Sequence, residues 1–375
     1  MTVYLLAGGG TAGHVNPMLA IARRLRLHDS SCEILMLGTA EGLEARLVPE
    51  AGFELLTIAK VPFPRRPNWA AVNFVPRWYR AVRDVVALIR ERKVDVVIGV
   101  GGYAAAPAYS AARSAKVPLV IHEANARPGL ANRLGARWTR FVGVAIEGTP
   151  LRHARLVGMP LRAEFEKSVT DSQRQAAKKS FGFDPTKPVV VVTGGSLGAR
   201  RINETIAAIA PDFERAGVQI LHLTGRQKSM MDSVVRQSPD DVLKNTSYVA
   251  LEYCDRMRDA LASADLIVSR AGASTVCEIA ALGLPAVFVP YPVGNGEQRF
   301  NAVPLVNAGA AVLVADADFT PDWVRYNVLS LVQDSTRLRN MARLSSTCGI
   351  RDGAERMCAL IGEARAEARS ARTLG

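Results

Sequence analysis

The two halves of the chain repeat one pattern, and this repeat limits the folds that the sequence can adopt. The apolar run VYLLA leads into GGGTAG near the N-terminus, and VVVVT leads into GGSLG at residues 189–198. Asp95 and Asp265 each open a second matching segment, in which an apolar strand, a glycine turn and a small-residue helix lead to an X-Pro step and another strand. Continuous Val/Ile-rich strands that alternate with helices are typical of parallel sheets covered on both faces. The sequence therefore predicts an α/β fold of two doubly wound parallel-sheet domains, both Rossmann-like, facing a cleft.

Length and charge distribution predict where the two domains meet. With 375 residues, of which 49% are hydrophobic, the chain is long enough for two separate cores. The polar, charged stretch from about Arg162 to Pro188 is the predicted linker. We therefore expect an N-terminal domain at residues 1–161 and a C-terminal domain at residues 162–352, with the last helix, about residues 353–375, packed back on the N-terminal domain.

The composition argues against several classes of protein. No apolar run approaches the roughly 18 residues of a membrane span, and the N-terminus lacks the pattern of a secretory signal, so we expect a cytosolic chain. The five cysteines are scattered singly, without the C-x-x-C spacing of zinc or redox sites, and are expected to be small buried hydrophobic residues. The net charge of +12 favours phosphate-bearing partners. Nucleic acid is the least favoured of these, because the sequence has no zinc-finger spacing, long basic run or aromatic RNA-binding signature.

The first glycine-rich stretch has the spacing G-x-G-x-x-G, formed by Gly8, Gly10 and Gly13. In a dinucleotide-binding fold, an acidic residue about 20 positions later must stand at the carboxyl end of the second strand to bind the ribose. Glu33 has this distance, but it begins the predicted strand EILMLG and so stands at the wrong end. His14 directly follows the loop, where a dinucleotide site would present backbone donors alone. We therefore interpret the loop as a phosphate or sugar cradle that carries a catalytic group.

Six ordered blocks of sequence carry a family resemblance. They are GGTAGHVNPMLAIA, VGGYAAAPAYSA, HEANARPGLANR, GGSLGARRIN, RAGASTVCEIAALGLPAVFVPYP and EQRFNAVPL. In this order and at these separations, the blocks resemble the family of UDP-N-acetylglucosamine transferases that convert lipid I to lipid II in peptidoglycan synthesis. The resemblance spans nearly the whole chain.

The resemblance implies a GT-B glycosyltransferase fold and an inverting enzyme. It implies transfer of GlcNAc from UDP-GlcNAc to the O4 hydroxyl of MurNAc in lipid I, which is undecaprenyl-pyrophosphoryl-MurNAc-pentapeptide. Neither a cofactor nor a metal is implied. The expected location is peripheral, at the cytoplasmic face of the plasma (inner) membrane, with an anionic membrane surface as a partner and room for other cell-wall synthesis proteins.

Residues of the second half are predicted to bind the sugar nucleotide. A glycine loop that opens a helix offers backbone N–H donors and a helix dipole to phosphates, and the GGSLG loop has this form. A tight turn without a ligand is the alternative interpretation. The resemblance places Ser196 of this loop and Arg162 at the pyrophosphate. It assigns Glu278 to the ribose hydroxyls, for which a surface glutamate on an amphipathic helix is the other interpretation.

The resemblance also assigns the remaining donor contacts. The backbone at Cys254 would read the uracil, and Gln298 and Asn301 would bind the GlcNAc hydroxyls. The other residues assigned to UDP-GlcNAc are Thr11, Ala12, Gly13, Asn125, Ala273, Ser274, Thr275 and Val276.

His14 is the candidate general base. Inverting transfer requires a group that takes the acceptor's proton as the hydroxyl attacks opposite to UDP, and an imidazole with a near-neutral pKa suits this role. The structural alternative is that His14 caps its own helix. His122 and Glu123 are the rival candidates for the base. The resemblance places Tyr103 and Asn132 on the acceptor side.

The sequence departs from the family pattern at two positions. The usual G-T-G-G-H has Ala12 as its third residue, and the usual H-E-Q-N has Ala124. Neither change removes a proposed catalytic group, but both alter the finer geometry expected of the acceptor site. Asp316 and Asp318 imitate a metal-binding D-x-D, but the following FTPD predicts a turn and a helix that starts with proline. A turn is therefore the preferred interpretation, and no metal ligands are predicted.

Residues 61–93 mix aromatic and basic side chains. Their second part, residues 80–93, predicts an ordinary amphipathic helix that packs an apolar stripe on the N-terminal domain. Aromatic rings beside arginines in the first part suit a lipid headgroup layer. The predicted membrane patch consists of Phe63, Arg65, Arg66, Trp69, Phe74 and Trp78.

Other function classes fit the sequence less well than a lipid-linked glycosyltransferase. Another UDP-sugar enzyme of the same fold, such as a UDP-GlcNAc 2-epimerase, would not need the acceptor-side blocks HEAN and GGY. A nicotinamide-dependent oxidoreductase would need the missing ribose acid. A noncatalytic lipid-pyrophosphate binding protein would not need Glu278, Gln298 and a uracil segment together.

Overall fold

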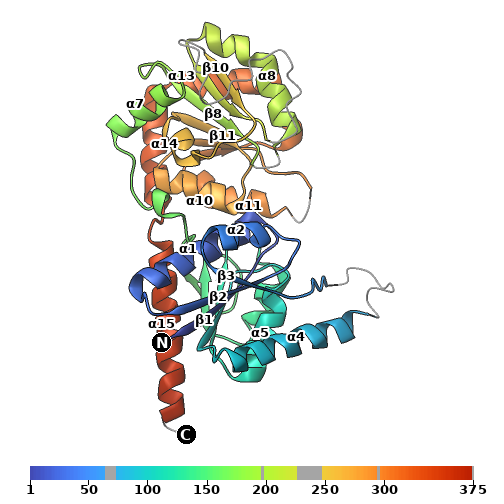
Figure 1. Ribbon diagram of the computed structural model, residues 1–375. Helices are drawn as coiled ribbons and strands as arrows, with labels where there is room; N and C mark the ends of the chain where they lie inside the picture. Colours follow the sequence, from blue (N-terminus) through green and yellow to red (C-terminus); the bar gives the residue numbers. More distant parts are fainter. Residues whose placement is uncertain (64–72, 196–197, 226–246, 294–295, 374–375) are drawn as a thin grey trace. The chain divides into compact units, whose positions relative to one another are not determined.

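The computed structural model describes residues 1–63, 73–195, 198–225, 247–293 and 296–373 (Figure 1). The chain forms two compact units. Unit 1 is Met1–Ala163 with Arg351–Gly375, and unit 2 is Glu164–Ile350. The last helix, α15 (Gly353–Thr373), therefore belongs to unit 1 although it follows unit 2 in the sequence.

Unit 1 is built around a parallel sheet with the strand order β3-β2-β1-β4-β5-β6-β7. Leu5 of β1 pairs with Leu35 of β2 on one side and with Val97 of β4 on the other. The direction of winding reverses between β1 and β4, as in doubly wound folds. The strands are β1 (Val3–Ala7), β2 (Glu33–Gly38), β3 (Glu54–Thr57), β4 (Val96–Gly99), β5 (Leu119–Glu123), β6 (Phe141–Val144) and β7 (Ala154–Leu156).

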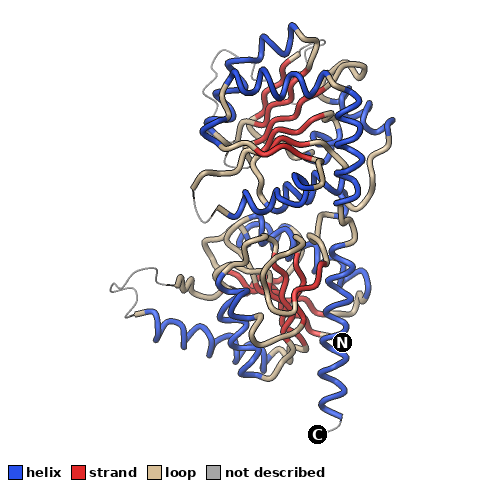
Figure 2. Tube along the Cα trace, turned by 180° about the vertical axis from the view of Figure 1, so that it is seen from behind, coloured by secondary structure: helices blue, strands red, loops and turns tan. Residues whose placement is uncertain are grey.

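Helices cover both faces of this sheet because its central strands are apolar at almost every position. Successive side chains of a strand point to opposite faces. Tyr4 and Leu6 of β1 pack with α1 (Ala12–His28) and α15, whereas Leu5 and Ala7 pack with α4 (Phe74–Glu91) and α5 (Ala105–Ala115). Figure 2 shows these helices on either side of the strands. The shorter helices of unit 1 are α2 (Glu44–Glu50) and α6 (Leu130–Gly135).

Unit 2 repeats this architecture with a parallel sheet of strand order β10-β9-β8-β11-β12-β13. Its winding reverses between β8 and β11. The strands are β8 (Val189–Thr193), β9 (Gln219–Leu223), β10 (Tyr248–Leu251), β11 (Leu266–Ser269), β12 (Ala286–Phe288) and β13 (Ala311–Leu313). The α-helices are α7 (Asp171–Ser180), α8 (Arg200–Arg215), α9 (Met257–Ala262), α10 (Ala273–Leu282), α11 (Glu297–Asn307), α12 (Pro321–Val324), α13 (Ser330–Gln333) and α14 (Ser335–Cys348). Short 3₁₀ segments lie at Ala163–Phe165 and Asp316–Asp318, and a π-helical turn lies at Arg325–Leu329.

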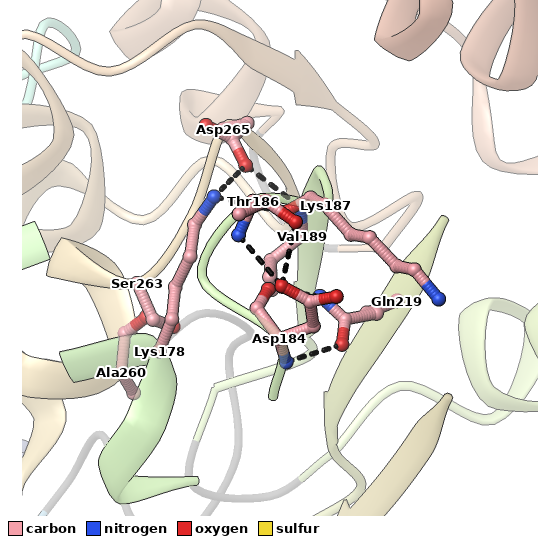
Figure 3. A network of polar contacts seen from close by, with 9 residues as sticks. All are labelled: Lys178, Asp184, Thr186, Lys187, Val189, Gln219, Ala260, Ser263 and Asp265. Atoms are coloured by element: carbon pink, nitrogen blue, oxygen red, sulfur yellow. Dashed lines mark hydrogen bonds and ion pairs between the residues drawn. The ribbon is translucent and has the colours of Figure 1, made fainter. Parts of the chain in front are cut away.

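Asp95 and Asp265, which open the repeated segments, make the same contact in both units. The Val3 N–H donates to Asp95 Oδ2 at 2.9 Å, and the Val189 N–H donates to Asp265 Oδ2 at 2.7 Å. Each aspartate thereby joins the first strand of its sheet to the strand across the switch point. In unit 2, Lys178 Nζ donates to the same Asp265 oxygen at 2.7 Å (Figure 3). These contacts lie at the amino ends of the strands, whereas ligands of such sheets bind at the carboxyl ends.

The predicted fold class, two doubly wound parallel sheets, is confirmed. Glu33, which has the sequence distance of a ribose-binding acid, begins β2 at the amino end of the sheet. Its carboxylate pairs with the Arg92 guanidinium there. The structure therefore gives Glu33 a role in fastening α4 to the sheet edge, far from the glycine loop.

Candidate functional site

The first glycine loop lies at the carboxyl end of β1, at the switch point of unit 1. Gly9 and Gly10 have φ angles of +146° and +91°, which residues with a side chain rarely adopt. A Cβ atom on Gly102, in the turn after β4, would lie 2.4 Å from the Gly9 carbonyl oxygen. The two glycine turns are therefore in direct backbone contact.

His14 stands in the first turn of α1 and is half-buried. Its Nδ1 lies 3.3 Å from Thr11 Oγ1. A Cβ atom on Gly101 would lie 3.1 Å from His14 Nε2, so the glycine makes room for the imidazole. Thr11, the N-cap residue of α1, makes no side-chain cap hydrogen bond. Ala12 and Gly13 are half-buried beside it, and Thr11 is exposed.

Glu44 is a buried carboxylate that contacts the first glycine loop, and it is absent from the residues predicted from the sequence. It is the first residue of α2, and its Oε2 accepts a hydrogen bond from the Gly10 N–H at 2.7 Å. The Thr39 N–H and hydroxyl both donate to Oε1 at 2.9 Å. In the sequence, Glu44 follows the strand-end stretch GTAEG at residues 38–42. Such a stretch looks like an ordinary surface turn, so nothing in it marks the glutamate as buried.

Glu123 ends β5 as a second buried carboxylate, with 3% of its surface exposed. Its Oε1 accepts from the Asn125 N–H at 2.9 Å. Its Oε2 accepts from the Gly129 N–H and from Asn132 Nδ2, each at 2.9 Å. These bonds wrap the loop after β5 around the carboxylate, so both oxygens are engaged by donors of the protein itself.

Asn132, on α6, is buried within a chain of hydrogen bonds. Tyr109 Oη donates to its Oδ1 at 2.7 Å, and its Nδ2 donates to the His122 carbonyl oxygen at 3.0 Å as well as to Glu123. Burial raises the pKa of Tyr109 well above its usual range, so the hydroxyl stays protonated. Tyr109 was not predictable as a site residue, because one tyrosine in an alanine-rich helix looks like an ordinary core residue in sequence.

His122 is fully buried on β5. Burial lowers its pKa to about 4, so the imidazole is neutral at physiological pH. Its Nε2 lies 3.0 Å from the Gly158 carbonyl oxygen, to which the neutral ring donates. His122 therefore ties β5 to the segment that follows β7.

The remaining predicted residues of unit 1 differ in exposure. Tyr103 is 43% exposed in the second glycine turn, and the Lys60 ammonium lies 4.5 Å from its ring centroid. Asn125 is half-buried, and the methyl group of Ala124 is buried. Arg162 is half-buried and lies at the end of the first segment of unit 1.

The second glycine loop lies at the carboxyl end of β8, the equivalent position in unit 2. Gly195 and Gly198 have φ angles of +81° and +68°. A Cβ atom on Gly194 would lie 2.3 Å from the Ala199 nitrogen at the start of α8, so the loop closes tightly onto the helix. The predicted phosphate-binding Ser196 lies outside the described residues.

Helix α10 presents its predicted residues at the neighbouring strand end, after β11. Ala273 and Val276 are buried and pack the helix onto the unit, whereas Ser274, Thr275 and Glu278 are half-buried. Glu278 is thus not a fully exposed surface glutamate.

Gln298 and Asn301 on α11 both bind backbone groups of strand-end loops. Gln298 Oε1 accepts from the Tyr291 N–H at 2.9 Å, and Asn301 Nδ2 donates to the Ala271 carbonyl oxygen at 3.2 Å. Asn301 is fully buried. Between β10 and α9, Cys254 is half-buried, and burial raises the pKa of its thiol, so a thiolate is disfavoured.

Asp316 of the D-x-D sequence is held by arginines. Its Oδ1 lies 2.5 Å from Arg270 Nη1, and its Oδ2 lies 3.3 Å from Arg201 Nε. Two guanidinium groups thus neutralise the carboxylate, and Asp316–Asp318 itself forms a single 3₁₀ turn, as the sequence predicts. Within the described ranges, no three His, Cys, Asp or Glu side chains are grouped to hold a metal ion.

Phe63, Phe74 and Trp78 form an aromatic cluster in which ring centroids lie 5.4 to 5.6 Å apart. Beside it, Val75 and Tyr79 are 54% and 71% exposed. The first turns of α4 lie beyond the edge of the sheet (Figures 1 and 2).

The first buried residue of α4 is Ala81, so the aromatic cluster stands apart from the core of unit 1. Arg65, Arg66 and Trp69 of the predicted membrane patch lie outside the described residues. No helix in the described part of the chain is long and apolar enough to cross a membrane.

Comparison with known proteins finds family matches in both units. The glycosyltransferase family 28 N-terminal domain matches residues 4–144, and the glycosyltransferase family 28 C-terminal domain matches residues 189–357. The chain is 58% identical to a UDP-N-acetylglucosamine--N-acetylmuramyl-(pentapeptide) pyrophosphoryl-undecaprenol N-acetylglucosamine transferase of Leifsonia xyli, over 96% of this chain and 98% of the relative. It is 46% identical to the protein of that name from Streptomyces avermitilis, over 96% and 98% of the two chains.

Solved structures share the fold of the whole chain. MurG from Acinetobacter baumannii matches with a TM-score of 0.79 and 27% identity, over 97% of this chain and 100% of that chain. A UDP-GlcNAc 2-epimerase from Neisseria meningitidis matches with a TM-score of 0.68 over 97% and 100% of the chains, but at 14% identity. This second similarity is one of fold alone.

Proposed function

The chain belongs to glycosyltransferase family 28, and we propose that it transfers GlcNAc from UDP-GlcNAc to the O4 hydroxyl of MurNAc in lipid I, forming lipid II for peptidoglycan synthesis. Nearly full-length similarity to relatives named for this transfer carries the proposal. The family resemblance and the GT-B fold inferred from the six sequence blocks are confirmed by the same matches.

The proposed reaction inverts the configuration at the transferred carbon. The O4 oxygen of MurNAc attacks C1 of GlcNAc on the face opposite UDP, so that a β-linked C1–O4 bond forms while the α-linked C1–O bond to the phosphate breaks. UDP leaves with the electron pair of that bond, and the O4 proton passes to a base. Backbone N–H groups at the start of α8 suit the charge that grows on the leaving phosphate.

His14 is the proposed base. A general base must come within hydrogen-bond reach of the acceptor hydroxyl. His14 is half-buried at the mouth of the glycine loop, whereas Glu123 is enclosed by three protein donors and His122 is buried and bonded to Gly158. These contacts favour positioning roles for Glu123 and His122, which shape the loop that carries Asn125.

The donor-binding assignments remain family-based proposals. Glu278 would accept hydrogen bonds from both ribose hydroxyls, and its half-burial on α10 is compatible with a ligand contact. Arg162 and Ser196 would meet the pyrophosphate, and the Cys254 backbone would read the uracil. Gln298 and Asn301 already orient the loops after β12 and β11, so contacts with GlcNAc would be made by a preorganised segment.

We also propose peripheral binding to an anionic membrane surface at the cytoplasmic face. The exposed Val75 and Tyr79 stand beside the aromatic cluster, and the chain carries a net charge of +12. Tyr103, which is exposed, is the acceptor-side residue able to contact lipid I directly. Asn132 is buried and would act through Glu123.

The test of the proposed function is a transfer assay with UDP-GlcNAc labelled in the sugar and a soluble lipid I analogue. Label is expected to move to the acceptor with release of UDP, and to stay on the nucleotide when the acceptor is omitted. Label that reaches no acceptor would contradict the proposal. An epimerase would instead alter the nucleotide sugar without any acceptor.

A further inference from the structure

Glu44 is a fully buried carboxylate that accepts hydrogen bonds from backbone N–H groups and a hydroxyl. It is 0% exposed at the start of α2. In the described part of the chain, its hydrogen-bond partners are the Gly10 N–H, the Thr39 N–H and hydroxyl, and its own backbone N–H. Carboxylates are rarely buried without a positive partner. The arrangement therefore calls for a reason beyond packing.

The two oxygens of Glu44 join three segments at the carboxyl end of the sheet. Oε2 accepts from Gly10 at 2.7 Å, in the loop between β1 and α1. Oε1 accepts from Thr39 at 2.9 Å twice, at the end of β2. The glutamate itself belongs to α2, so one side chain fixes the exits of two neighbouring strands.

Three glycines leave the space that this carboxylate fills. A Cβ atom on Gly9 would lie 2.3 Å from Glu44 Oε1, one on Gly38 would lie 2.5 Å from Glu44 Cγ, and one on Gly42 would lie 2.0 Å from Oε2. Each distance is shorter than any real contact. Glycines in three separate segments thus form a cradle matched to the glutamate side chain.

The cradle holds the charged form of the side chain. Burial alone would raise the pKa of Glu44, but hydrogen bonds from Gly10, Thr39 and its own backbone lower the pKa below the usual value. The group is therefore a carboxylate at neutral pH. Each bond to it is charge-assisted and hence stronger than a bond between neutral groups.

We propose that Glu44 is a positioning residue that fixes the first glycine loop, and through it the placement of His14, for glycosyl transfer. Gly10 has no side chain, and its φ is +91°. Because glycine can adopt many backbone conformations, the hydrogen bond to Glu44 is needed to hold Gly10 in this one. It lies two residues before Ala12, the first residue of α1. Because the Gly10 N–H donates to Glu44, it is not available to donate to a ligand.

The expected effect of Glu44 on kcat rests on the proposed function, whereas its expected effect on the backbone of the glycine loop does not. The test compares Glu44→Gln with Glu50→Gln, a matched control on the same helix whose exposed carboxylate pairs with Arg46. The amide of Glu44→Gln keeps the size of the side chain but has one acceptor oxygen. Either Gly10 or Thr39 must then face an NH₂ group instead of an oxygen.

Hydrogen exchange at the backbone amides from Gly10 to His14 is the first readout, and steady-state kinetics is the second. We expect Gly10 exchange about tenfold faster in Glu44→Gln than in the wild type, since a charge-assisted bond is lost. We expect kcat to fall about 10- to 100-fold with the KM for UDP-GlcNAc within about twofold, because a displaced catalytic group weakens the transition state more than ground-state binding. Glu50→Gln should match the wild type in both readouts.

Wild-type exchange together with wild-type kcat in Glu44→Gln would overturn the inference. A kinetic loss carried by KM alone would also overturn it. If the wild type itself transferred no GlcNAc, the proposed function would fail while the exchange readout still tested the cradle. If Glu44→Gln failed to fold, Thr39→Val would replace it, because this variant removes the hydroxyl bond to Glu44 Oε1. We expect Thr39→Val to lower kcat and Thr39→Ser, which keeps the hydroxyl, to restore it. Equal kcat in the two Thr39 variants would reject the positioning role.

Discussion

The side-chain amide of Asn132 donates to Glu123 Oε2 at 2.9 Å, in the interior of unit 1. Because the Asn125 and Gly129 N–H groups also donate to this carboxylate, Glu123 is an anchor for the loop after β5 rather than an open acceptor of protons. Tyr109 completes the chain of bonds by donating to the other end of the Asn132 amide. The loop after β5, which carries Asn125, is thus held in place by buried polar groups.

Tyr109→Phe tests this chain without changing the packing of the ring. The substitution leaves the buried Asn132 Oδ1 without its donor at 2.7 Å. We expect the free energy of unfolding to fall by about 1–3 kcal/mol, the usual penalty of an unsatisfied buried acceptor. Urea denaturation measures this change. Tyr79→Phe, at an exposed tyrosine of the same unit, is the control and should leave the midpoint unaltered; equal stability of both variants would show that the Tyr109 hydroxyl is dispensable.

His14→Ala tests the assignment of the general base. If His14 takes the proton of the acceptor hydroxyl, turnover should drop by about 10²- to 10⁴-fold, while binding of UDP-GlcNAc stays nearly intact. Calorimetric titration with UDP-GlcNAc and single-turnover kinetics separate the two effects. Turnover equal to that of the wild type would remove His14 from the mechanism and return Glu123 to consideration.

His222 makes the stability of unit 2 depend on pH. It is buried on β9 with Nδ1 at 2.6 Å from Tyr248 Oη and Nε2 at 3.1 Å from Asn203 Oδ1. Burial lowers its pKa to about 4, whereas an unfolded histidine titrates near about 6.5. Between these values the unfolded state binds more protons than the folded state, so the free energy of unfolding must fall as pH drops from about 6.5 to about 4.

The measurement for His222 is a series of denaturation curves across that pH window. His222→Gln should flatten the pH dependence by about 1.4 kcal/mol per pH unit at most, the share of one histidine. Identical slopes for the wild type and His222→Gln would show that protonation of this residue is not linked to unfolding.

The double variant Val75→Glu with Tyr79→Glu tests whether the exposed side of the aromatic cluster binds a membrane. Both side chains are exposed beside the aromatic cluster, so carboxylates there would repel an anionic bilayer. We expect the double variant to sediment less with phosphatidylglycerol vesicles at low salt, with activity toward a soluble acceptor retained. Tyr326→Glu, at an exposed tyrosine of unit 2, is the control for an added charge elsewhere. Equal sedimentation of all three proteins would leave the aromatic cluster as ordinary domain surface.

The fold class was predictable because both halves of the sequence carry the same pattern of apolar strand, glycine turn and helix. The strands after Asp95 and Asp265 are apolar at almost every position, which is typical of strands buried on both faces. The two aspartates make equivalent contacts in the structure. The glycine turns at the strand ends were predictable for the same reason, since G-x-G and GGY mark the positions where backbone segments touch.

The hydrogen-bond partners beneath these turns were not predictable from the sequence. Glu44 and Tyr109 act through contacts with residues that are distant in sequence, such as Gly10 and Asn132, and neither lies in a recognisable spacing. Burial also separates residues that look alike in sequence. His14 and His122 both lie near the carboxyl end of a strand in the sequence, but His122 is fully buried whereas His14 is half-buried.

The linkage formed in the product is the sharpest test of the proposed glycosyl transfer. Wild-type protein, UDP-GlcNAc and a soluble lipid I analogue are incubated with EDTA, and the product is examined by proton NMR at the transferred anomeric carbon. Inverting transfer should give a disaccharide with GlcNAc β-linked to O4 of MurNAc, and one UDP released for each bond formed. An α-linked product, an epimerised nucleotide sugar, or transfer that appears only when Mg²⁺ replaces EDTA would contradict it.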